Sequence, residues 1–138
     1  MPGREWLVHR QGFRWPVPRA FYDLPAPRLV LTHGGGYLPY QIGRLDHGYL
    51  VRPESGGCAH APSAYLSRFW FDTVTHAPRP LRFLTETVGT GHVVYGTDYP
   101  FDMAAGPLAD QLAGTGLAPA DTELIAGRNA AALFGVPG

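Results

Sequence analysis

The sequence predicts an α/β fold built around a parallel sheet, and three observations support this class. Short apolar runs rich in strand-forming residues alternate with segments of helical periodicity, an order typical of parallel strands joined by right-handed crossovers. Two of these runs end on chemically useful side chains, His33 and Asp98, where α/β folds place their chemistry. Finally, 138 residues are too few for a closed eight-stranded barrel, which takes about 250.

The first two strand–helix units are expected between residues 29 and 88. A strand over Leu29–His33 is followed by three glycines and then by a helix at about Leu38–Val51, whose apolar positions recur every three to four residues. A second strand covers Arg68–Thr73. Pro78 then opens a helix that runs through Val88 and ends at glycines.

The third unit follows directly. A strand is expected at His92–Thr97, and a loop from Pro100 to Pro107 comes after it. The helices expected beyond this loop lie at about Leu108–Ala113, at Thr122–Ala126 with Asp121 as its cap, and at Ala130–Phe134 with Asn129 as its cap. Three parallel strands leave both sheet edges unpaired, so we expect this chain to form part of a larger unit.

Charge and composition exclude several classes of function. The chain carries 11 basic and 11 acidic residues, so bulk charge does not favour a nucleic acid or an anionic membrane as partner. All basic residues are arginine, which excludes a mechanism through a lysine Schiff base. Cys58 is the only cysteine, so there is no intrachain disulfide, and with no signal peptide we expect a cytoplasmic protein.

Residues 1–20 differ from the rest of the chain. They combine arginines, two tryptophans and three prolines, and they show little periodicity. We therefore expect a poorly ordered lead-in at 1–20, followed by the folded part at 21–138. No apolar run approaches the ~20 residues that a membrane-spanning helix needs.

His33 and Asp98 are the strongest candidates for chemistry, and each has a structural alternative. The glycines after His33 permit a close backbone approach to a ligand, or they form only a tight turn beside a hydrogen-bonded histidine. Asp98 can bind a metal or move a proton, or it can cap the turn that follows. We expect the two side chains to share one edge of the sheet.

Other candidates carry weaker signals. Arg44 has the chemistry to bind a carboxylate with two hydrogen bonds, although a solvated surface arginine is the plainer interpretation. Asp72 ends the second strand and His76 follows it, whereas Cys58 has no obvious activating partner. The sequence contains no His-x-His, HExxH or Cys-x-x-Cys motif.

Four segments taken together resemble a known family. In order, the segments are Thr32-His33-Gly34-Gly35-Gly36, Pro39–Tyr49, Gly96-Thr97-Asp98-Tyr99-Pro100-Phe101 and Ala126–Gly135. They resemble the carboxyl-terminal part of the aminocarboxymuconate-semialdehyde decarboxylase-like proteins of the amidohydrolase superfamily. The resemblance implies a metal-dependent (β/α)8 TIM barrel that is incomplete in this chain. The three strands would then be its sixth to eighth.

The same resemblance implies roles for four residues. His33 would be the catalytic histidine that activates a metal-bound water, and Asp98 would be a metal ligand and proton carrier. Arg44 would reach a substrate carboxylate across a homodimer, and Phe101 would line the substrate pocket. The implied cofactor is Zn2+, with a ligand set that this chain leaves incomplete. The implied reaction is decarboxylation of a small carboxylic acid.

Three functional hypotheses stay open at this point. The chain is part of a decarboxylase or a related metal-dependent hydrolase, or it is a truncated remnant without the amino-terminal metal ligands and without catalysis. The third hypothesis is a small binding module whose glycine turn takes an anion without metal.

Overall fold

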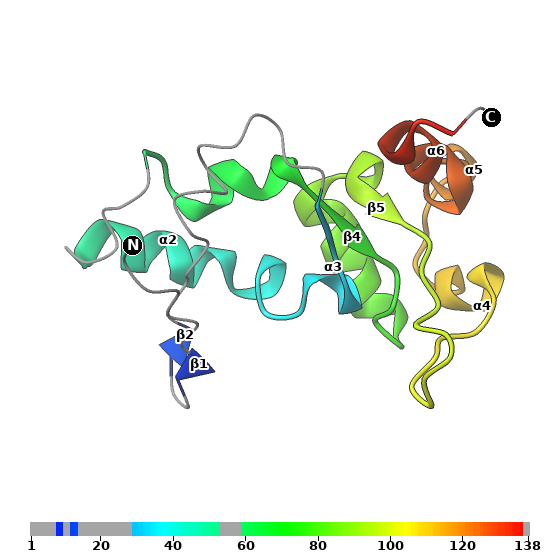
Figure 1. The fold of residues 1–138 in the computed structure, drawn as a ribbon, viewed down its shortest axis with the longest axis horizontal. Helices are drawn as coiled ribbons and strands as arrows, with labels where there is room; N and C mark the ends of the chain where they lie inside the picture. The colour runs from blue at the N-terminus through cyan, green and yellow to red at the C-terminus, as the bar shows by residue number, and fades with distance from the viewer. Residues whose placement is uncertain (1–7, 10–11, 14–28, 53–58, 137–138) are drawn as a thin grey trace, which may run out of the picture.

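A three-stranded parallel sheet lies at the centre of the computed structural model (Figure 1). The structure describes residues 8–9, 12–13, 29–52 and 59–136. The strands are β3 (Leu29–Leu31), β4 (Phe69–Asp72) and β5 (Val93–Val94), in the order β3-β4-β5. Val30 pairs with Trp70, and Phe71 pairs with Val93. The parallel sheet with helical connections confirms the predicted fold class.

The outer strands are shorter than predicted, and hydrogen bonding explains why. The strand expected at His92–Thr97 is reduced to β5, because the backbone N–H of Tyr95 donates to the carbonyl of Ile125 at 3.1 Å instead of to a neighbouring strand. The strand expected at Leu29–His33 ends at Leu31. There the carbonyl of Thr32 accepts from the backbone N–H of Gly35 at 3.0 Å and starts a turn.

Helix α3 (Pro78–Val88) covers one face of the sheet and confirms the predicted element (Figure 1). It begins at Pro78, which needs no intrahelical hydrogen-bond partner, and it ends at Gly89 with φ of 84°. Leu81 and Leu84 are fully buried, and each stabilises the fold by about 1.5–3 kcal/mol. The buried core comprises Leu38, Tyr65, Leu66, Phe69, Phe71, Leu81, Leu84, Val93 and Ile125.

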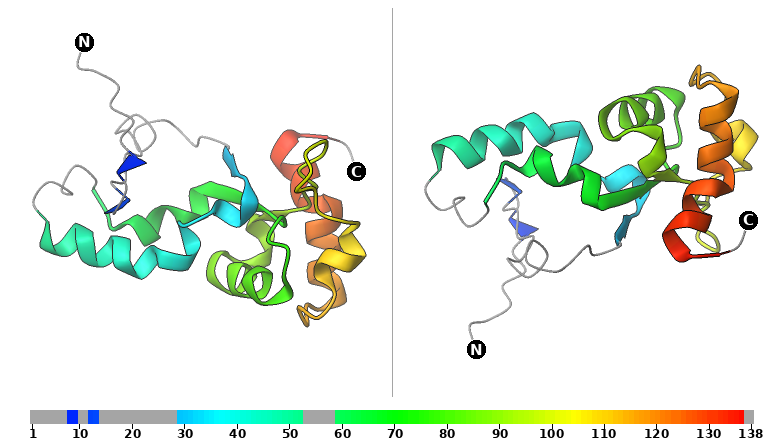
Figure 2. Two further views of the ribbon diagram at one scale, coloured as in Figure 1. Left: turned by 90° about the horizontal axis from the view of Figure 1, so that it is seen from below. Right: turned by 90° about the horizontal axis from the view of Figure 1, so that it is seen from above.

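Helix α2 (Ile42–Val51) extends away from the sheet, on the side opposite the carboxyl-terminal helices (Figure 2). A 3-10 turn at Pro39–Gln41 leads into it, so the helix predicted from Leu38 exists with an irregular start. None of its residues is fully buried. A second 3-10 segment, Pro62–Arg68, packs beside it and enters β4, and the N–H of Ser63 donates to Asp46 Oδ1 at 2.9 Å.

The carboxyl-terminal helices differ from the prediction. After α4 (Leu108–Leu112), the elements α5 (Pro119–Glu123) and α6 (Asn129–Phe134) join into one helical run through a π-helical turn at Leu124–Arg128. Asp121 and Asn129 were expected to cap two separate helices, and neither side chain makes an N-cap hydrogen bond.

Both side chains instead attach this helical run to the sheet. The Asn129 amide donates to the carbonyls of Thr90 and Val93, each at 2.7 Å. Asp121 Oδ1 accepts from the Thr90 hydroxyl at 2.8 Å. Residues predicted to start helices therefore hold the end of the chain against β5, on the right of Figure 1.

Within the predicted lead-in at 1–20, the structure describes only β1 (Val8–His9) and β2 (Gly12–Phe13), which pair antiparallel. The remainder of 1–20 lies outside the described residues, as does Cys58, so the predicted poor order of this segment stays a prediction. No helix within the described ranges is long and apolar enough to cross a bilayer.

Candidate functional site

The turn after β3 places His33 at the carboxyl edge of the sheet. His33 has a positive φ of 56°, and Gly34 and Gly35 continue the turn with φ of 59° and 77°. A side chain at Gly34 would come within 2.7 Å of Thr75, and one at Gly35 within 2.6 Å of the Phe71 ring. The turn therefore requires glycine for both its conformation and its packing. The tight turn that the sequence offers as one interpretation of these glycines is therefore present.

Asp98 lies at the same edge and meets His33. His33 Nε2 is 3.4 Å from Asp98 Oδ1, although 65 positions of sequence separate the residues. Asp98 also has a positive φ, 59°. The turn that follows it is closed by a backbone hydrogen bond from the N–H of Phe101 to the Asp98 carbonyl at 3.0 Å, so the Asp98 side chain is not needed as a cap. The predicted juxtaposition of His33 and Asp98 is confirmed.

The His33–Asp98 pair is open to ligands. The side chain of His33 is 61% exposed and that of Asp98 is 21% exposed. An exposed ion pair of this kind contributes little to folding, about 0–1 kcal/mol. Its side chains are therefore held close by the backbone turns more than by their attraction for each other.

Asp72, the last residue of β4, has a structural role that the sequence did not indicate. Its buried carboxylate accepts three backbone hydrogen bonds. Oδ2 accepts from His33 at 3.0 Å, and Oδ1 accepts from Gly34 at 2.8 Å and from Val74 at 3.0 Å. Asp72 therefore joins the β3 turn to the end of β4. No sequence motif marks its link to the β3 turn, because two of its three partners lie 38 and 39 positions away.

Tyr40 lies under the same glycine turn, where a Cβ on Gly34 would come within 3.1 Å of its hydroxyl. The hydroxyl donates to the Pro80 carbonyl at 3.3 Å, and the ring stacks on Phe83 with centroids 5.4 Å apart. Burial raises the pKa of Tyr40 above its ordinary value of 10.0, and the negative charge of Asp72 raises it further. Tyr40 is therefore a neutral hydrogen-bond donor that supports the turn.

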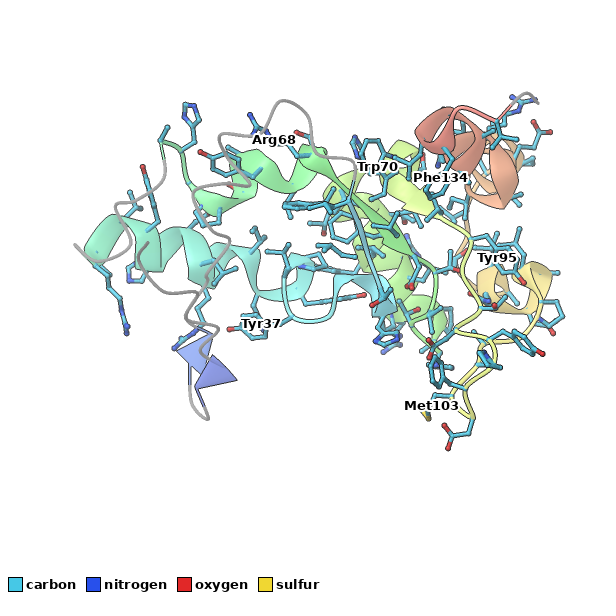
Figure 3. All side chains as sticks on the ribbon, in the orientation of Figure 1. Tyr37, Arg68, Trp70, Tyr95, Met103 and Phe134 are labelled. Atoms are coloured by element: carbon cyan, nitrogen blue, oxygen red, sulfur yellow. The ribbon has the colours of Figure 1, made fainter. Side chains whose placement is uncertain are left out.

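A pocket of about 510 Å³ opens in front of the His33–Asp98 pair. Its walls come from the turns after β3 and β4 and from the loop after β5, and Figure 3 shows Met103 near the tip of that loop. The lining residues are His33, Val74, His76, Asp98, Phe101, Asp102 and Met103. Polar groups and exposed apolar side chains thus converge on one concave surface, as small-molecule sites require.

The structure brings some predicted site residues together and leaves one apart. Phe101 lines the pocket beside the His33–Asp98 pair, where its predicted contact with substrate requires it. Arg44 is exposed on α2 and is not among the lining residues of that pocket. Within one chain, Arg44 therefore does not join the site, and its predicted action across a homodimer stays a prediction.

The residues that the structure describes do not complete a metal site. They contain no group of three or more His, Cys, Asp or Glu side chains placed to hold a metal ion. Zinc in proteins normally has three or more protein ligands. Asp98 remains one expected ligand, and further ligands would have to come from outside the described ranges.

Comparison with known proteins identifies the family. A sequence model of the amidohydrolase family matches residues 15–136, so the chain belongs to this family. Two curated relatives are named 2-amino-3-carboxymuconate-6-semialdehyde decarboxylase. The relative from Caenorhabditis elegans is 43% identical over 81 residues, which are 57% of this chain and 20% of that protein. The relative from Dictyostelium discoideum is 38% identical over 85 residues, 60% of this chain and 24% of that protein.

A solved structure agrees with this family. The dihydroxybenzoic acid decarboxylase from Polaromonas sp. JS666, with bound manganese and the inhibitor 2-nitroresorcinol, superposes with a TM-score of 0.71. It is 25% identical, and the match covers 84% of this chain and 36% of that chain. The three strands thus form part of an amidohydrolase-type (β/α)8 barrel. The relatives named here are carboxy-lyases, and the matched region spans only about a fifth to a quarter of the curated relatives.

Proposed function

We propose that this chain carries the acid–base pair of a metal-dependent decarboxylase that acts on an aminocarboxymuconate-semialdehyde-like or related small carboxylic acid. The observation that carries the proposal is the 3.4 Å approach of His33 Nε2 to Asp98 Oδ1 in an open pocket at the carboxyl edge of a parallel sheet. Relatives named as decarboxylases support the choice of reaction.

Decarboxylation replaces a carboxylate on carbon by a proton and releases carbon dioxide. The reaction therefore needs a group that delivers a proton to the carbon, and an imidazole close to a carboxylate is suited to that task. We assign the proton transfer to Asp98 with His33 as its partner, and contact with the apolar part of the substrate to Phe101. Arg44 is assigned to the substrate carboxylate, from the second subunit of a homodimer.

The proposed cofactor is a divalent metal ion, for which Zn2+ is our first choice and which Asp98 would help to bind. When bound, such an ion stabilises negative charge on the substrate. The described residues supply too few ligands for it alone, so we propose that ligands outside the described ranges complete the site.

The test measures carbon dioxide release and metal content in parallel. The full chain is incubated with zinc or manganese and with 2-amino-3-carboxymuconate-6-semialdehyde, and with 2,6-dihydroxybenzoate as a second substrate. His33→Ala is expected to lower turnover by about 10²–10⁴-fold while metal content stays unchanged. His47→Ala, at an exposed histidine on α2 that does not line the pocket, is the matched control and is expected to keep wild-type turnover.

One observation favours a second candidate, a non-catalytic remnant of the same fold. The described ranges hold no cluster of three metal-binding side chains. If the full chain binds neither metal and releases no carbon dioxide from either substrate, the remnant is correct and the decarboxylase proposal is wrong. Loss of metal in His33→Ala would instead assign His33 to the ligand set.

A further inference from the structure

Three residues at the pocket share an unusual backbone conformation. Among the residues that the structure describes, the non-glycine residues with positive φ are His33 at 56°, His76 at 55° and Asp98 at 59°. Side chains disfavour this conformation, so it is a marker of turns and of functional sites. All three residues line the pocket in front of the His33–Asp98 pair. His76 thus shares both the conformation and the location of the two predicted catalytic residues.

The turn after β4 fixes the position of His76. On one side of His76, the N–H of Thr75 donates to the carbonyl of Thr73 at 2.8 Å. Spanning it, the Thr75 hydroxyl donates to the carbonyl of Ala77 at 3.1 Å. Pro78 then begins α3. His76 is therefore held between two anchored elements, the end of β4 and the start of α3.

Packing does not explain the strained conformation of His76. The residue is exposed, and its imidazole has no hydrogen-bond partner within the described ranges. It also lines a second, adjoining pocket of about 230 Å³, which shares no other residue with the first. His76 thus lines both pockets, and its imidazole N–H makes no hydrogen bond to the described residues.

The charges around the pocket show what an acid substrate would need there. Asp98 and Asp102 contribute two carboxylates, which repel an anion when no metal ion is bound, as in the presence of EDTA. The imidazole of His33 already contacts the carboxylate of Asp98. Among the described residues that line this pocket, His76 is the other histidine, and its imidazole can donate a hydrogen bond. Phe101 and Met103 supply apolar surface for the carbon skeleton.

We propose that His76 is a substrate-binding residue that donates a hydrogen bond to an anionic oxygen of the small carboxylic acid in this pocket. The inference rests on the proposed function and names a contact that the resemblance does not assign. It also accounts for the presence of His76 in the same pocket as the His33–Asp98 pair, where it would orient the acid that reacts there.

A binding measurement tests this without relying on turnover. The sequence contains two methionines, and Met103 lines the pocket, so a 13C-methyl-methionine label gives a pocket signal that Met103→Leu assigns. Salicylate is titrated against the full chain in EDTA, with the neutral analogue salicylamide in parallel. The wild-type chain is expected to prefer salicylate. His76→Ala, which removes the donor, is expected to weaken salicylate binding about tenfold and to leave salicylamide binding unchanged.

Two further variants control for structure. His47→Ala replaces an exposed histidine outside the pocket and is expected to bind salicylate as the wild type does. His76→Gly removes the backbone strain together with the imidazole. The melting temperature of His76→Gly is expected to be a few degrees above that of the wild type, and the variant is still expected to lose the preference for salicylate. A loss of binding without a loss of stability cannot be attributed to unfolding.

The outcomes separate the inference from the proposed function. Equal salicylate binding by wild type and His76→Ala overturns the inference, and so does an equal loss of salicylate and salicylamide binding. A third outcome is that salicylate binds only when manganese is present, and that wild type and the His76 variant bind it equally. This outcome overturns the inference and leaves the decarboxylase proposal intact. Absence of any Met103 shift, with or without manganese, overturns both.

Discussion

Asp72 and Asp98 are both aspartates at the ends of predicted strands, but the structure buries the carboxylate of Asp72 and leaves that of Asp98 partly exposed. Asp72 is the last residue of β4, Asp98 lies four positions after the end of β5, and both lie at the carboxyl edge of the sheet. Asp72 is buried and accepts hydrogen bonds from three backbone N–H groups. Asp98 is partly exposed, lines a pocket and faces an imidazole.

The comparison shows that two aspartates at similar positions in a fold can have different partners and different roles. Asp72 accepts hydrogen bonds from the backbone of the turn that carries His33, whereas Asp98 lies beside Nε2 of the His33 side chain. A carboxylate satisfied by backbone donors is unavailable for a ligand, whereas one that faces an open pocket is available. The number of backbone donors around an aspartate therefore distinguishes the two roles, and sequence position does not.

The largest expected effect is on stability at Asp72. Asp72→Ala leaves three backbone N–H groups without their acceptor, two of them in buried hydrogen bonds, at a cost of about 1–2 kcal/mol each. We expect the free energy of unfolding in urea to fall by about 3–6 kcal/mol. Asp98→Ala is expected to change it by less than about 1 kcal/mol, because its ion pair is exposed.

A milder variant keeps this prediction testable if Asp72→Ala does not fold. Asp72→Asn retains one acceptor oxygen and places an amide against backbone donors, so an intermediate loss is expected. Equal losses at positions 72 and 98 would show that the three backbone hydrogen bonds do not distinguish the two aspartates.

A smaller change, a gain in the free energy of unfolding, is expected when Asp98 is replaced by glycine. Because Asp98 has φ of 59°, glycine in its place relieves strain of about 1 kcal/mol. Asp102→Gly is the matched control, since it removes the same charge from the same loop at a residue without positive φ. In thermal or urea unfolding, Asp98→Gly is expected to be more stable than Asp102→Gly by about 1 kcal/mol. Greater stability of Asp102→Gly would contradict a strained backbone at Asp98.

Much of the architecture was predictable because it depends on local patterns. The proline and glycine at the two ends of α3, with the apolar spacing of Leu81 and Leu84, defined that helix correctly. The meeting of His33 and Asp98 was predictable because carboxyl ends of parallel strands share one edge. Their catalytic roles, and those of Arg44 and Phe101, stay predictions.

Contacts between distant segments account for the errors. The strand at His92–Thr97 was predicted too long, because the residue that takes the Tyr95 N–H, Ile125, lies 30 positions later. Asn129 was taken for a cap because asparagine favours helix starts, yet its amide bonds the carbonyls of Thr90 and Val93. The role of Asp72 was missed for the same reason, since short polar side chains serve distant backbone groups without leaving a motif.

The smallest expected effect extends the comparison to Tyr40, whose pKa is raised by burial and then by the charge of Asp72. A folded-state pKa above the unfolded value means that the unfolded chain loses the phenolic proton first. The resulting stability is present below pH 10 and is lost as pH rises through the folded-state pKa.

We expect the free energy of unfolding of the Tyr40→Phe variant to fall less steeply above pH 10 than that of the wild type. The lost hydrogen bond to Pro80 gives only a constant offset, visible at pH 7. Asp72→Asn should reduce the same alkaline slope in part, whereas Asp98→Asn should leave it unchanged. Parallel slopes for wild type and Tyr40→Phe would mean that Asp72 and burial do not act on this hydroxyl.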